Sequence, residues 1–307
     1  MSDLPEHTRI YQNHHLDSTR WDGFEPRDGD IIIVTPYKGG TTWTQAIVAN
    51  LLFPGGAFPA PVWQMSPWLD SRVMPVEDVL ARFSAQKHRR MIKTHLPIDG
   101  LPFFPQCKYI FVSRDGRDVF MSFWNHYSNY TDAAYDRFNG APGRVGPPLP
   151  RATFDVHECW RAWCTRGWFD WESDGWPFWS ALHLTQSWWD YRHLPNIVTL
   201  HYADMKKDTP AAIARIAGFL DIEVSDPQLS TITKAVSLDA MRDQGQDYVP
   251  RGGELWKGGA DTFLNKGTNG RWRDVLSADE LKLYDAACDR ALSDDCRAWL
   301  ENGGPIS

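Results

Sequence analysis

Residues 30–43 read Asp30-Ile-Ile-Ile-Val-Thr-Pro-Tyr-Lys-Gly-Gly-Thr-Thr-Trp43, and this stretch decides the fold. It opens with a short apolar run rich in β-branched side chains, which is typical of a strand buried on both faces of a parallel sheet. After the turn, Trp43, Ile47 and Leu51 recur at four-residue spacing, which indicates one face of a helix. The stretch therefore predicts a buried strand, a tight turn and a helix in succession.

The same order of elements returns twice further along the chain. Residues 108–113 predict a second strand, and a helix with an apolar stripe from Val119 to Tyr127 follows it. Residues 196–201 predict a third strand, and Thr209-Pro210 is a favourable start for the next helix. Strands that alternate with helices predict an α/β fold around a parallel sheet.

The turn at residues 38–42 has the composition of an anion-binding site. Gly39 and Gly40 let the main chain approach a ligand, Thr41 and Thr42 offer hydroxyls, and Lys38 adds a positive charge. Such a turn at a helix start collects free N–H groups and the positive end of the helix dipole, which together bind phosphate. It is not a Walker A loop, because the lysine precedes the glycines. The alternative is an ordinary turn whose glycines only supply unusual backbone angles.

A second basic turn follows the strand at residues 108–113. Arg114 stands where the carboxyl edge of a parallel sheet receives ligands, and Ser122 follows on the first turns of the next helix. An arginine can bind a phosphate through two donors while a serine hydroxyl binds a third oxygen. The alternative is that Arg114 and Arg117 pair with the neighbouring Asp115 and Asp118 on a solvated surface.

Two further segments carry candidate chemistry. Residues 263–273 place the cations Lys266, Arg271 and Arg273 among glycines, so they either close over a phosphate or form a basic loop without a ligand. Residues 91–97 place Lys93 two positions before His95, on one side if the segment is a strand. A neutral imidazole near a hydroxyl can accept its proton during attack, although most histidines have no such role.

Composition limits the function. The chain has 307 residues and a formal net charge of −7, which argues against a general nucleic-acid partner and requires a private cationic pocket for any anionic ligand. We see no signal peptide in residues 1–30 and no apolar run of the roughly 18 residues that a membrane span requires, so we expect a cytoplasmic protein. Five cysteines without a CxxC pair indicate reduced, packed thiols.

Read together and in order, four segments resemble the cytosolic-type sulfotransferase family. They are Thr35-Pro-Tyr-Lys-Gly-Gly-Thr-Thr-Trp43, Lys93-Thr-His-Leu-Pro97, Ser113-Arg-Asp-Gly-Arg-Asp-Val-Phe-Met-Ser122 and Lys266-Gly-Thr-Asn-Gly-Arg-Trp-Arg273. The resemblance covers residues 30–283 and includes the Tyr202 segment. It implies a sulfotransferase domain at residues 30–307 behind an N-terminal extension at 1–29. That domain would be one α/β unit with a central parallel sheet flanked by helices.

The resemblance also implies a reaction. The co-substrate would be 3′-phosphoadenosine 5′-phosphosulfate (PAPS), no metal would be needed, and a hydroxyl or amine of a small acceptor would receive the sulfuryl group. The implied catalytic residues are His95 as the base, Lys93 beside it, and Lys38 on the oxygen that becomes the leaving phosphate. The implied binding residues for the co-substrate are Lys38, Gly39, Gly40, Thr41, Thr42 and Trp43 at the 5′ end, Arg114, Ser122, Lys266 and Gly267 at the 3′-phosphate, and Tyr202 and Ser237 with Trp43 near the adenine.

Three departures from the family pattern stand out. Gly39 occupies the position of a usual serine that is credited with restraining hydrolysis of the co-substrate. Asn265 replaces a usual arginine, which should weaken the 3′-phosphate site unless Arg271 or Arg273 substitutes. The C-terminal dimerisation motif of the family is shortened and unmatched around residues 273–280, so the family's dimer is not implied here and the oligomeric state stays open.

The acceptor is the least determined part. Eight tryptophans crowd residues 160–189, and we expect part of them to be core and part, with Phe58, Trp63 and Trp68, to line an apolar acceptor pocket. That composition favours a lipophilic or aromatic acceptor. Residues 139–150 are rich in proline and glycine and form either a lid or a solvated loop. The rival functions are a P-loop kinase for small molecules and a catalytically silent nucleotide-binding protein.

Overall fold

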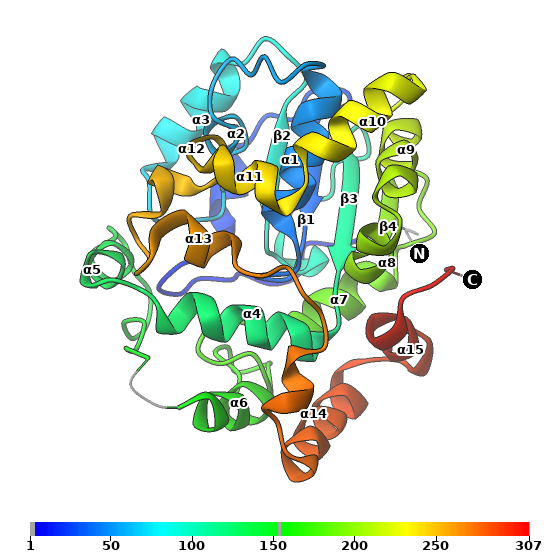
Figure 1. Cartoon of the computed structure of the whole chain (residues 1–307). Helices are drawn as coiled ribbons and strands as arrows, with labels where there is room; N and C mark the ends of the chain where they lie inside the picture. Colours follow the sequence, from blue (N-terminus) through cyan, green and yellow to red (C-terminus); the bar gives the residue numbers. More distant parts are fainter. Residues whose placement is uncertain (1–3, 153–154, 307) are drawn as a thin grey trace.

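The computed structural model describes residues 4–152 and 155–306. Within these residues a sheet of parallel strands has the order β2-β1-β3-β4 (Figure 1). The strands are β1 (Ile31–Val34), β2 (Met91–Thr94), β3 (Lys108–Ser113) and β4 (Ile197–His201). The predicted α/β fold is confirmed, and two of the predicted strands are shorter because Asp30 and Asn196 precede the paired segments.

The chain adds β2 on one side of β1 and β3 on the other, so the order of the strands changes direction at β1. β1 pairs with β2 on one side, with Ile33 opposite Lys93, and with β3 on the other, with Val34 opposite Phe111. Parallel α/β sheets bind ligands outside the carboxyl ends of the strands at such a switch point. The turns after β1, β2 and β3 carry three of the four predicted site segments, so the topology brings these three to one edge.

Helices flank the sheet on both faces. The main ones are α1 (Thr41–Leu52), α2 (Val62–Met65), α3 (Val76–Ala85), α4 (Gly116–Ser128), α5 (Asp132–Asn139), α6 (Val156–Thr165), α7 (Ala181–Trp189), α8 (Tyr202–Lys207), α9 (Thr209–Phe219), α10 (Asp226–Ala235), α11 (Leu238–Asp243), α12 (Gly245–Tyr248), α13 (Gly259–Leu264), α14 (Ala278–Ala291) and α15 (Asp294–Asn302). Short 3-10 helices are η1 (Ser18–Gly23), η2 (Ile98–Gly100), η3 (Pro250–Gly253) and η4 (Arg271–Asp274).

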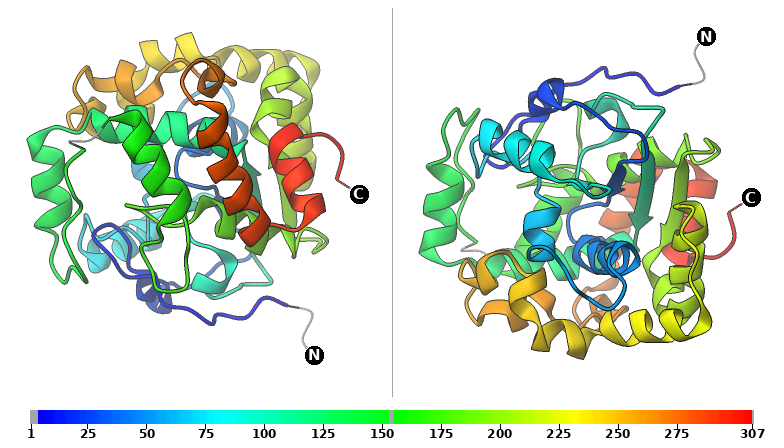
Figure 2. Two further views of the ribbon diagram at one scale, coloured as in Figure 1. Left: turned by 90° about the horizontal axis from the view of Figure 1, so that it is seen from below. Right: turned by 90° about the horizontal axis from the view of Figure 1, so that it is seen from above.

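Alternating side chains of β1 divide the core into two layers. Ile31 and Ile33 pack with α1, α9 and α10, whereas Ile32 and Val34 pack with α4, α6, α7, α14 and α15. The two end-on views show these helices on opposite sides of the strands (Figure 2). All four side chains of β1 are buried, as expected for a central parallel strand.

Two regions for which the sequence suggested other roles are buried in the core layer around Ile32 and Val34. Tyr11, Leu16 and Trp21 belong to the stretch expected to be an extension, yet they are buried in this core. Trp160 and Trp163 of α6 are also buried there, and their rings stack with centroids 5.6 Å apart. The expectation that part of the tryptophan-rich stretch belongs to the core is therefore confirmed.

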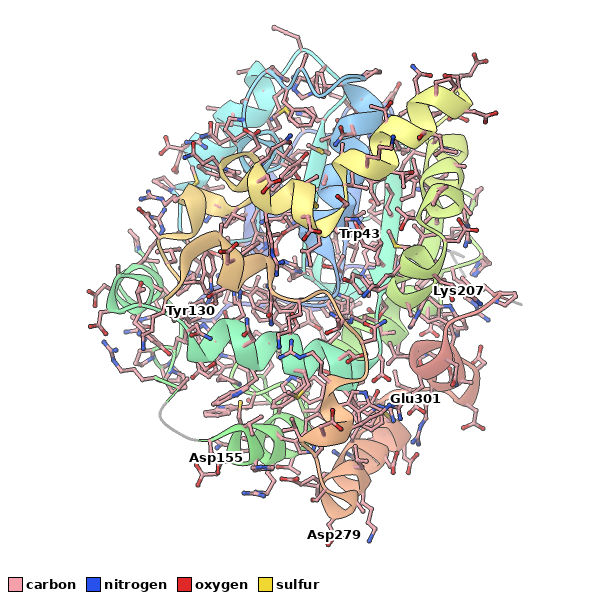
Figure 3. All side chains as sticks on the ribbon, in the orientation of Figure 1. Trp43, Tyr130, Asp155, Lys207, Asp279 and Glu301 are labelled. Carbon is pink, nitrogen blue, oxygen red and sulfur yellow. The ribbon has the colours of Figure 1, made fainter. Side chains whose placement is uncertain are left out.

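Acidic side chains lie mainly at the periphery. Asp155 and Asp279 are exposed and stand at the edge of the molecule, while Trp43 lies near its centre (Figure 3). The five cysteines are free and buried, as the sequence indicated. Among the described helices none is both long and apolar enough to cross a bilayer.

Candidate functional site

A cavity of about 770 Å³ opens at the carboxyl edge of the sheet. This volume is in the range of ligand pockets, roughly 300–1,000 Å³. Its lining includes lysine and arginine side chains from many separate segments: Lys38, Arg82, Lys93, Arg114, Arg137, Lys206, Arg251, Lys266 and Arg271. No aspartate or glutamate of the described chain lines it. The cavity is therefore cationic inside a protein of net charge −7, which is the private pocket that an anionic ligand requires.

The turn between β1 and α1 forms the floor of this cavity. Lys38 adopts a left-handed backbone conformation with φ of 72°, which is uncommon for a residue with a side chain. Gly40 has φ of 117°, and a Cβ there would lie 2.9 Å from Cδ2 of Tyr202. Helix α1 begins at Thr41 without a side-chain cap, so its first N–H groups are available to a ligand. Such a helix start favours bound phosphate.

Arg114 lies on the other side of the cavity and joins two distant segments. It is buried, and its Nη2 donates to Asn269 Oδ1 at 2.8 Å and to the carbonyl of Thr268 at 2.9 Å. Its guanidinium also lies 4.4 Å from the ring centroid of Tyr202. The alternative pairing holds for Arg117 alone, which bonds Asp115. Arg114 instead faces the cavity, where Ser122 also lies.

The third basic segment contributes two cations to the lining. Lys266 and Arg271 line the cavity, whereas Arg273 lies outside the lining with its guanidinium over the Trp272 ring. The backbone of Gly267 turns with φ of 59°, and its carbonyl accepts from Lys206 Nζ at 2.5 Å. Arg271 and Arg273 were the candidates to replace the arginine that the family usually has at the position of Asn265. Of these two, Arg271 lines the cavity.

An apolar notch beside the basic turns suits a flat ring. Trp43 and Tyr202 meet edge to face with centroids 5.3 Å apart, and Trp43 Nε1 donates to the carbonyl of Val236 at 3.0 Å. Ser237 lines the same notch and also caps α11 through the N–H of Ala240. The structure therefore brings the predicted adenine residues together, with part of the Ser237 hydroxyl's capacity already used.

His95 lies one residue beyond the end of β2 and is buried. Its Nδ1 donates to the carbonyl of Thr35 at 2.8 Å. Because that carbonyl can only accept, Nδ1 carries the proton and Nε2 keeps a free lone pair. Burial and the charges of Lys93 and Lys38 lower the pKa of His95 to about 3. The imidazole is therefore neutral and oriented, as a general base must be.

The two cavity lysines near His95 are destabilised as cations. Burial, together with Lys93 and Arg114, lowers the pKa of Lys38 to about 7. Burial lowers the pKa of Lys93 to about 8, although Asp70 opposes the change. Lys93 Nζ lies 5.7 Å from the ring centroid of Trp68. An anion in the cavity would stabilise both charged forms, because opposite charge raises a lysine pKa.

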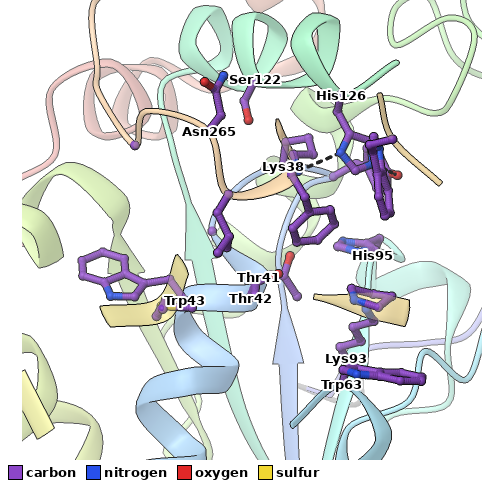
Figure 4. A pocket seen from close by; sticks show the side chains of 18 of the residues that line it. Lys38, Thr41, Thr42, Trp43, Trp63, Lys93, His95, Ser122, His126 and Asn265 are labelled. Carbon is purple, nitrogen blue, oxygen red and sulfur yellow. Dashed lines mark hydrogen bonds between the residues drawn. The ribbon is translucent and has the colours of Figure 1, made fainter. Parts of the chain in front are cut away.

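A chain of hydrogen bonds leads away from Lys38, and the dashed line in Figure 4 marks its first bond, between Lys38 and His126. Lys38 Nζ lies 3.1 Å from His126 Nδ1, and His126 Nε2 lies 2.9 Å from the Tyr37 hydroxyl. The Tyr37 hydroxyl in turn lies 2.9 Å from that of Tyr130. His126 comes from α4, four residues after Ser122, so both side chains share one face of that helix.

Aromatic side chains line another part of the cavity. Trp63, Trp68, Phe138, Trp256 and Phe263 line it. Trp63 and Trp68 were expected there, but Phe58 and the eight tryptophans of residues 160–189 are outside the lining. Trp160 and Trp163 of α6 and Trp188 and Trp189 of α7 are buried in the core layer around Ile32 and Val34, whereas Trp171 is exposed. Residues 139–150 also lie outside the lining, tied at the base by Asn139 and Leu149.

Sequence reasoning found the phosphate turns and missed other lining residues. His126, Lys206 and Tyr37 were not singled out as site residues, although each lines the cavity. The available signals were helical spacing from Ser122 for His126 and from Tyr202 for Lys206. Tyr37 lay inside the quoted turn itself. His14 and His15 are buried beyond the lining and carry no assigned role.

Known proteins resemble this chain in sequence and in fold. Residues 28–295 match the family described as "Sulfotransferase domain". A Mycobacterium bovis protein named "Glycolipid sulfotransferase" is 32% identical over 315 residues, covering 96% of this chain and 94% of the relative. An Arabidopsis thaliana protein named "Cytosolic sulfotransferase 12" is 30% identical over 272 residues, covering 83% and 74%. A mouse sulfotransferase complexed with PAP superposes with a TM-score of 0.66 at 20% identity, covering 92% of this chain and 91% of that one.

Proposed function

Because this chain belongs to the sulfotransferase family, we propose that it transfers a sulfuryl group from PAPS to a hydroxyl or amine of a small lipophilic or aromatic acceptor. One observation carries the proposal. Turns that are far apart in sequence converge on one cavity whose charged lining is entirely lysine and arginine in the described chain. A doubly phosphorylated adenosine needs cationic groups at two separated points, and Lys38 and Arg114 supply them.

The cavity residues divide into three groups by this proposal. Arg114 and Ser122, with Lys266, Gly267 and the added Arg271, would hold the 3′-phosphate through charge-assisted hydrogen bonds. Residues 38–43 would hold the 5′ end through the start of α1. Tyr202 and Ser237, together with Trp43, would enclose the adenine. The close approach of Gly40 to Tyr202, where a Cβ would collide with the ring, supports this arrangement because it places the phosphate turn against the proposed adenine site.

The chemistry would be acid–base and electrostatic. His95 Nε2 would take the proton from the acceptor hydroxyl while the acceptor oxygen forms its bond to sulfur. The bond between sulfur and the phosphate oxygen would break, and Lys38 would donate a hydrogen bond to that leaving oxygen. Lys93 would stabilise charge on the transferring group. Positioned cations and donors of this kind carry much of the catalysis in phosphoryl transfer, which spreads charge in the same way.

The acceptor would lie against the aromatic side of the cavity. Trp68 and Phe138 give that side an apolar surface, which suits a lipid or an aromatic ring. The Mycobacterium bovis relative is named a glycolipid sulfotransferase, which agrees with an apolar acceptor. Arg137 and Arg251 also line the cavity, and burial, together with the charge of Arg251, lowers the pKa of Arg137. An acceptor with an apolar body and an acidic group would complement both features.

The rival functions are separated by nucleotide preference. A P-loop kinase would bind ATP, and a catalytically silent protein would bind nucleotide without transferring anything. We expect titration calorimetry to give strong binding of 3′-phosphoadenosine 5′-phosphate (PAP) and at least about tenfold weaker binding of ADP and ATP, the difference of roughly one charge-assisted bond. Equal binding of ATP would overturn the assignment. Label transfer from [³⁵S]PAPS to a panel of phenols and alcohols then tests turnover, and binding without transfer would support the silent alternative.

A further inference from the structure

His126 receives a hydrogen bond from the lysine that the proposed reaction needs most. Lys38 Nζ and His126 Nδ1 are 3.1 Å apart, and the imidazole is buried with 2% of its surface exposed. The two side chains come from the turn after β1 and from the last turn of α4, so tertiary structure alone brings them together. The dashed contact in Figure 4 lies between the phosphate turn and the aromatic side of the cavity.

The charged form of Lys38 sets the tautomer of His126. A lysine ammonium can only donate, so beside it Nδ1 of His126 carries the lone pair and Nε2 the proton. Nε2–H then donates to the Tyr37 hydroxyl at 2.9 Å, and the hydroxyls of Tyr37 and Tyr130 share a further hydrogen bond of 2.9 Å in which either can donate. Tyr37 and Tyr130 therefore hold His126 in the tautomer that accepts from Lys38.

His126 has no means of becoming charged in this environment. The titratable groups that act on it are Lys38 from the β1 turn, Lys93 from β2, His95 beyond β2 and His15 from the N-terminal segment, and all of them oppose its charge. With burial as the largest cause, they hold the pKa of His126 well below its usual range. The imidazole is thus neutral, and it accepts the hydrogen bond from the ammonium form of Lys38.

We propose that His126 is a positioning residue for Lys38 in the sulfuryl transfer, an inference that rests on the proposed function. One of the three N–H donors of the Lys38 amine bonds His126, and the other two remain for the oxygen that leaves with the phosphate. The bond aims the amine at the cavity, and it also stabilises the ammonium against the surrounding cations, because hydrogen bonding to a charged form favours that form.

A purely structural role predicts a different outcome. The His126 ring packs against aromatic neighbours, with centroids 4.7 Å from Trp256 and 5.5 Å from Phe263. A phenylalanine would fill this space equally well but cannot accept from Lys38. His126→Phe therefore removes the bond while it keeps the packing. His126→Asn is the matched control, because an amide oxygen can stand close to the position of Nδ1.

The test measures turnover and the pKa of Lys38. For His126→Phe we expect kcat to fall about 10- to 100-fold, as for a misplaced catalytic group, with the Kd for PAP within about threefold of wild type. The alkaline limb of the kcat profile should move to lower pH. The pKa of Lys38, followed by pH-dependent acylation and mass spectrometry, should fall by at least about half a unit. His126→Asn should recover most of both losses. If loss of the hydrogen bond between His126 and the Tyr37 hydroxyl unfolds His126→Phe, the double variant Tyr37→Phe with His126→Phe is measured in its place.

Two results would overturn the proposal. One is a His126→Phe protein that keeps the wild-type kcat and the wild-type Lys38 pKa. The other is a His126→Asn protein that behaves like His126→Phe, since the acceptor would then be irrelevant. Failure of the proposed function is a separate result: wild-type protein would transfer no sulfuryl group, while the acylation measurement on Lys38 would still decide whether His126 supports the amine.

Discussion

Arg114 Nη2 donates to Asn269 Oδ1 at 2.8 Å, which fastens the turn after β3 to a loop 155 residues further along the chain. The bond closes one wall of the cavity, so the segment with Lys266 is ordered next to Arg114. Arg114 therefore has two roles in the proposed site: it offers donors to a 3′-phosphate, and it holds the loop that supplies further cations.

Arg114→Ala should weaken PAP specifically. We expect the Kd for PAP to rise by roughly 10- to 100-fold, because charge-assisted hydrogen bonds contribute about 1.5–3 kcal/mol. The affinity for adenosine 5′-phosphate, which lacks the 3′-phosphate, should fall far less in this variant. Calorimetry with both nucleotides measures the difference. Arg117→Ala is the matched control, because Arg117 bonds Asp115 outside the cavity lining; an equal loss in both variants would contradict a role for Arg114 in binding the phosphate.

His95→Ala should separate binding from transfer. The Kd for PAP is expected to stay within a few fold of wild type, while kcat falls by roughly 10²- to 10⁴-fold, the usual contribution of a general base. Initial rates with saturating [³⁵S]PAPS test the second part. His183→Ala, which removes a histidine paired with Asp99 outside the lining, controls for general damage. Retained turnover in His95→Ala would remove His95 from the proposed role.

PAP binding should weaken as the pH rises above 7. In the free chain the pKa of Lys38 is lowered to about 7 and that of Lys93 to about 8. A bound anion raises both pKa values, so complex formation takes up protons where the free amines are neutral. The Kd should rise at least about tenfold between pH 7 and 9. Calorimetry in buffers of different ionisation enthalpy measures the protons directly. Proton release, or a flat profile, would be the opposite of this expectation.

Gly40→Ala should damage the phosphate turn more than Gly39→Ala. Gly40 has φ of 117° and its Cβ would lie 2.9 Å from the Tyr202 ring. The backbone strain costs about 1–3 kcal/mol, and moving Tyr202 disturbs the notch with Trp43. Gly39 has no left-handed backbone, and its Cβ would meet Pro36 at 3.0 Å. Thermal unfolding and PAP titration compare the two variants, and equal behaviour would show that the approach to Tyr202 is unimportant.

Arg137→Gln should change acceptor choice without affecting the co-substrate. Arg137 lines the cavity beside Arg251 and makes no hydrogen bond or ion pair within the described chain. We expect KM to rise about tenfold for phenols that carry a carboxylate and to stay unchanged for neutral phenols. PAP affinity serves as the internal control. A variant that treats both classes like wild type would argue that the acceptor carries no acidic group at this end.

The predictable part of the site consists of local chemistry. Residues 30–43 specify a buried strand, a glycine turn and a helix through neighbours in sequence, and the turns with Arg114 and His95 follow strand ends in the same way. The sequence did not single out Lys206 and His126, because their positions in the site depend on how the helices pack. The acceptor side was partly wrong for the same reason: the aromatic residues of α6 and α7 fill the core, while Trp256 reaches the cavity from a distant segment.

The sequence by itself determined the strand-turn-helix units and the types of side chain at each turn, because hydrophobic periodicity and backbone preferences act over a few residues. Only the tertiary structure decided which side chains meet. The strand order around β1 sets Lys38 beside His126 and turns Arg114 toward Asn269. These contacts depend on the packing of the whole core. No short segment of the sequence specifies which distant segment it will contact.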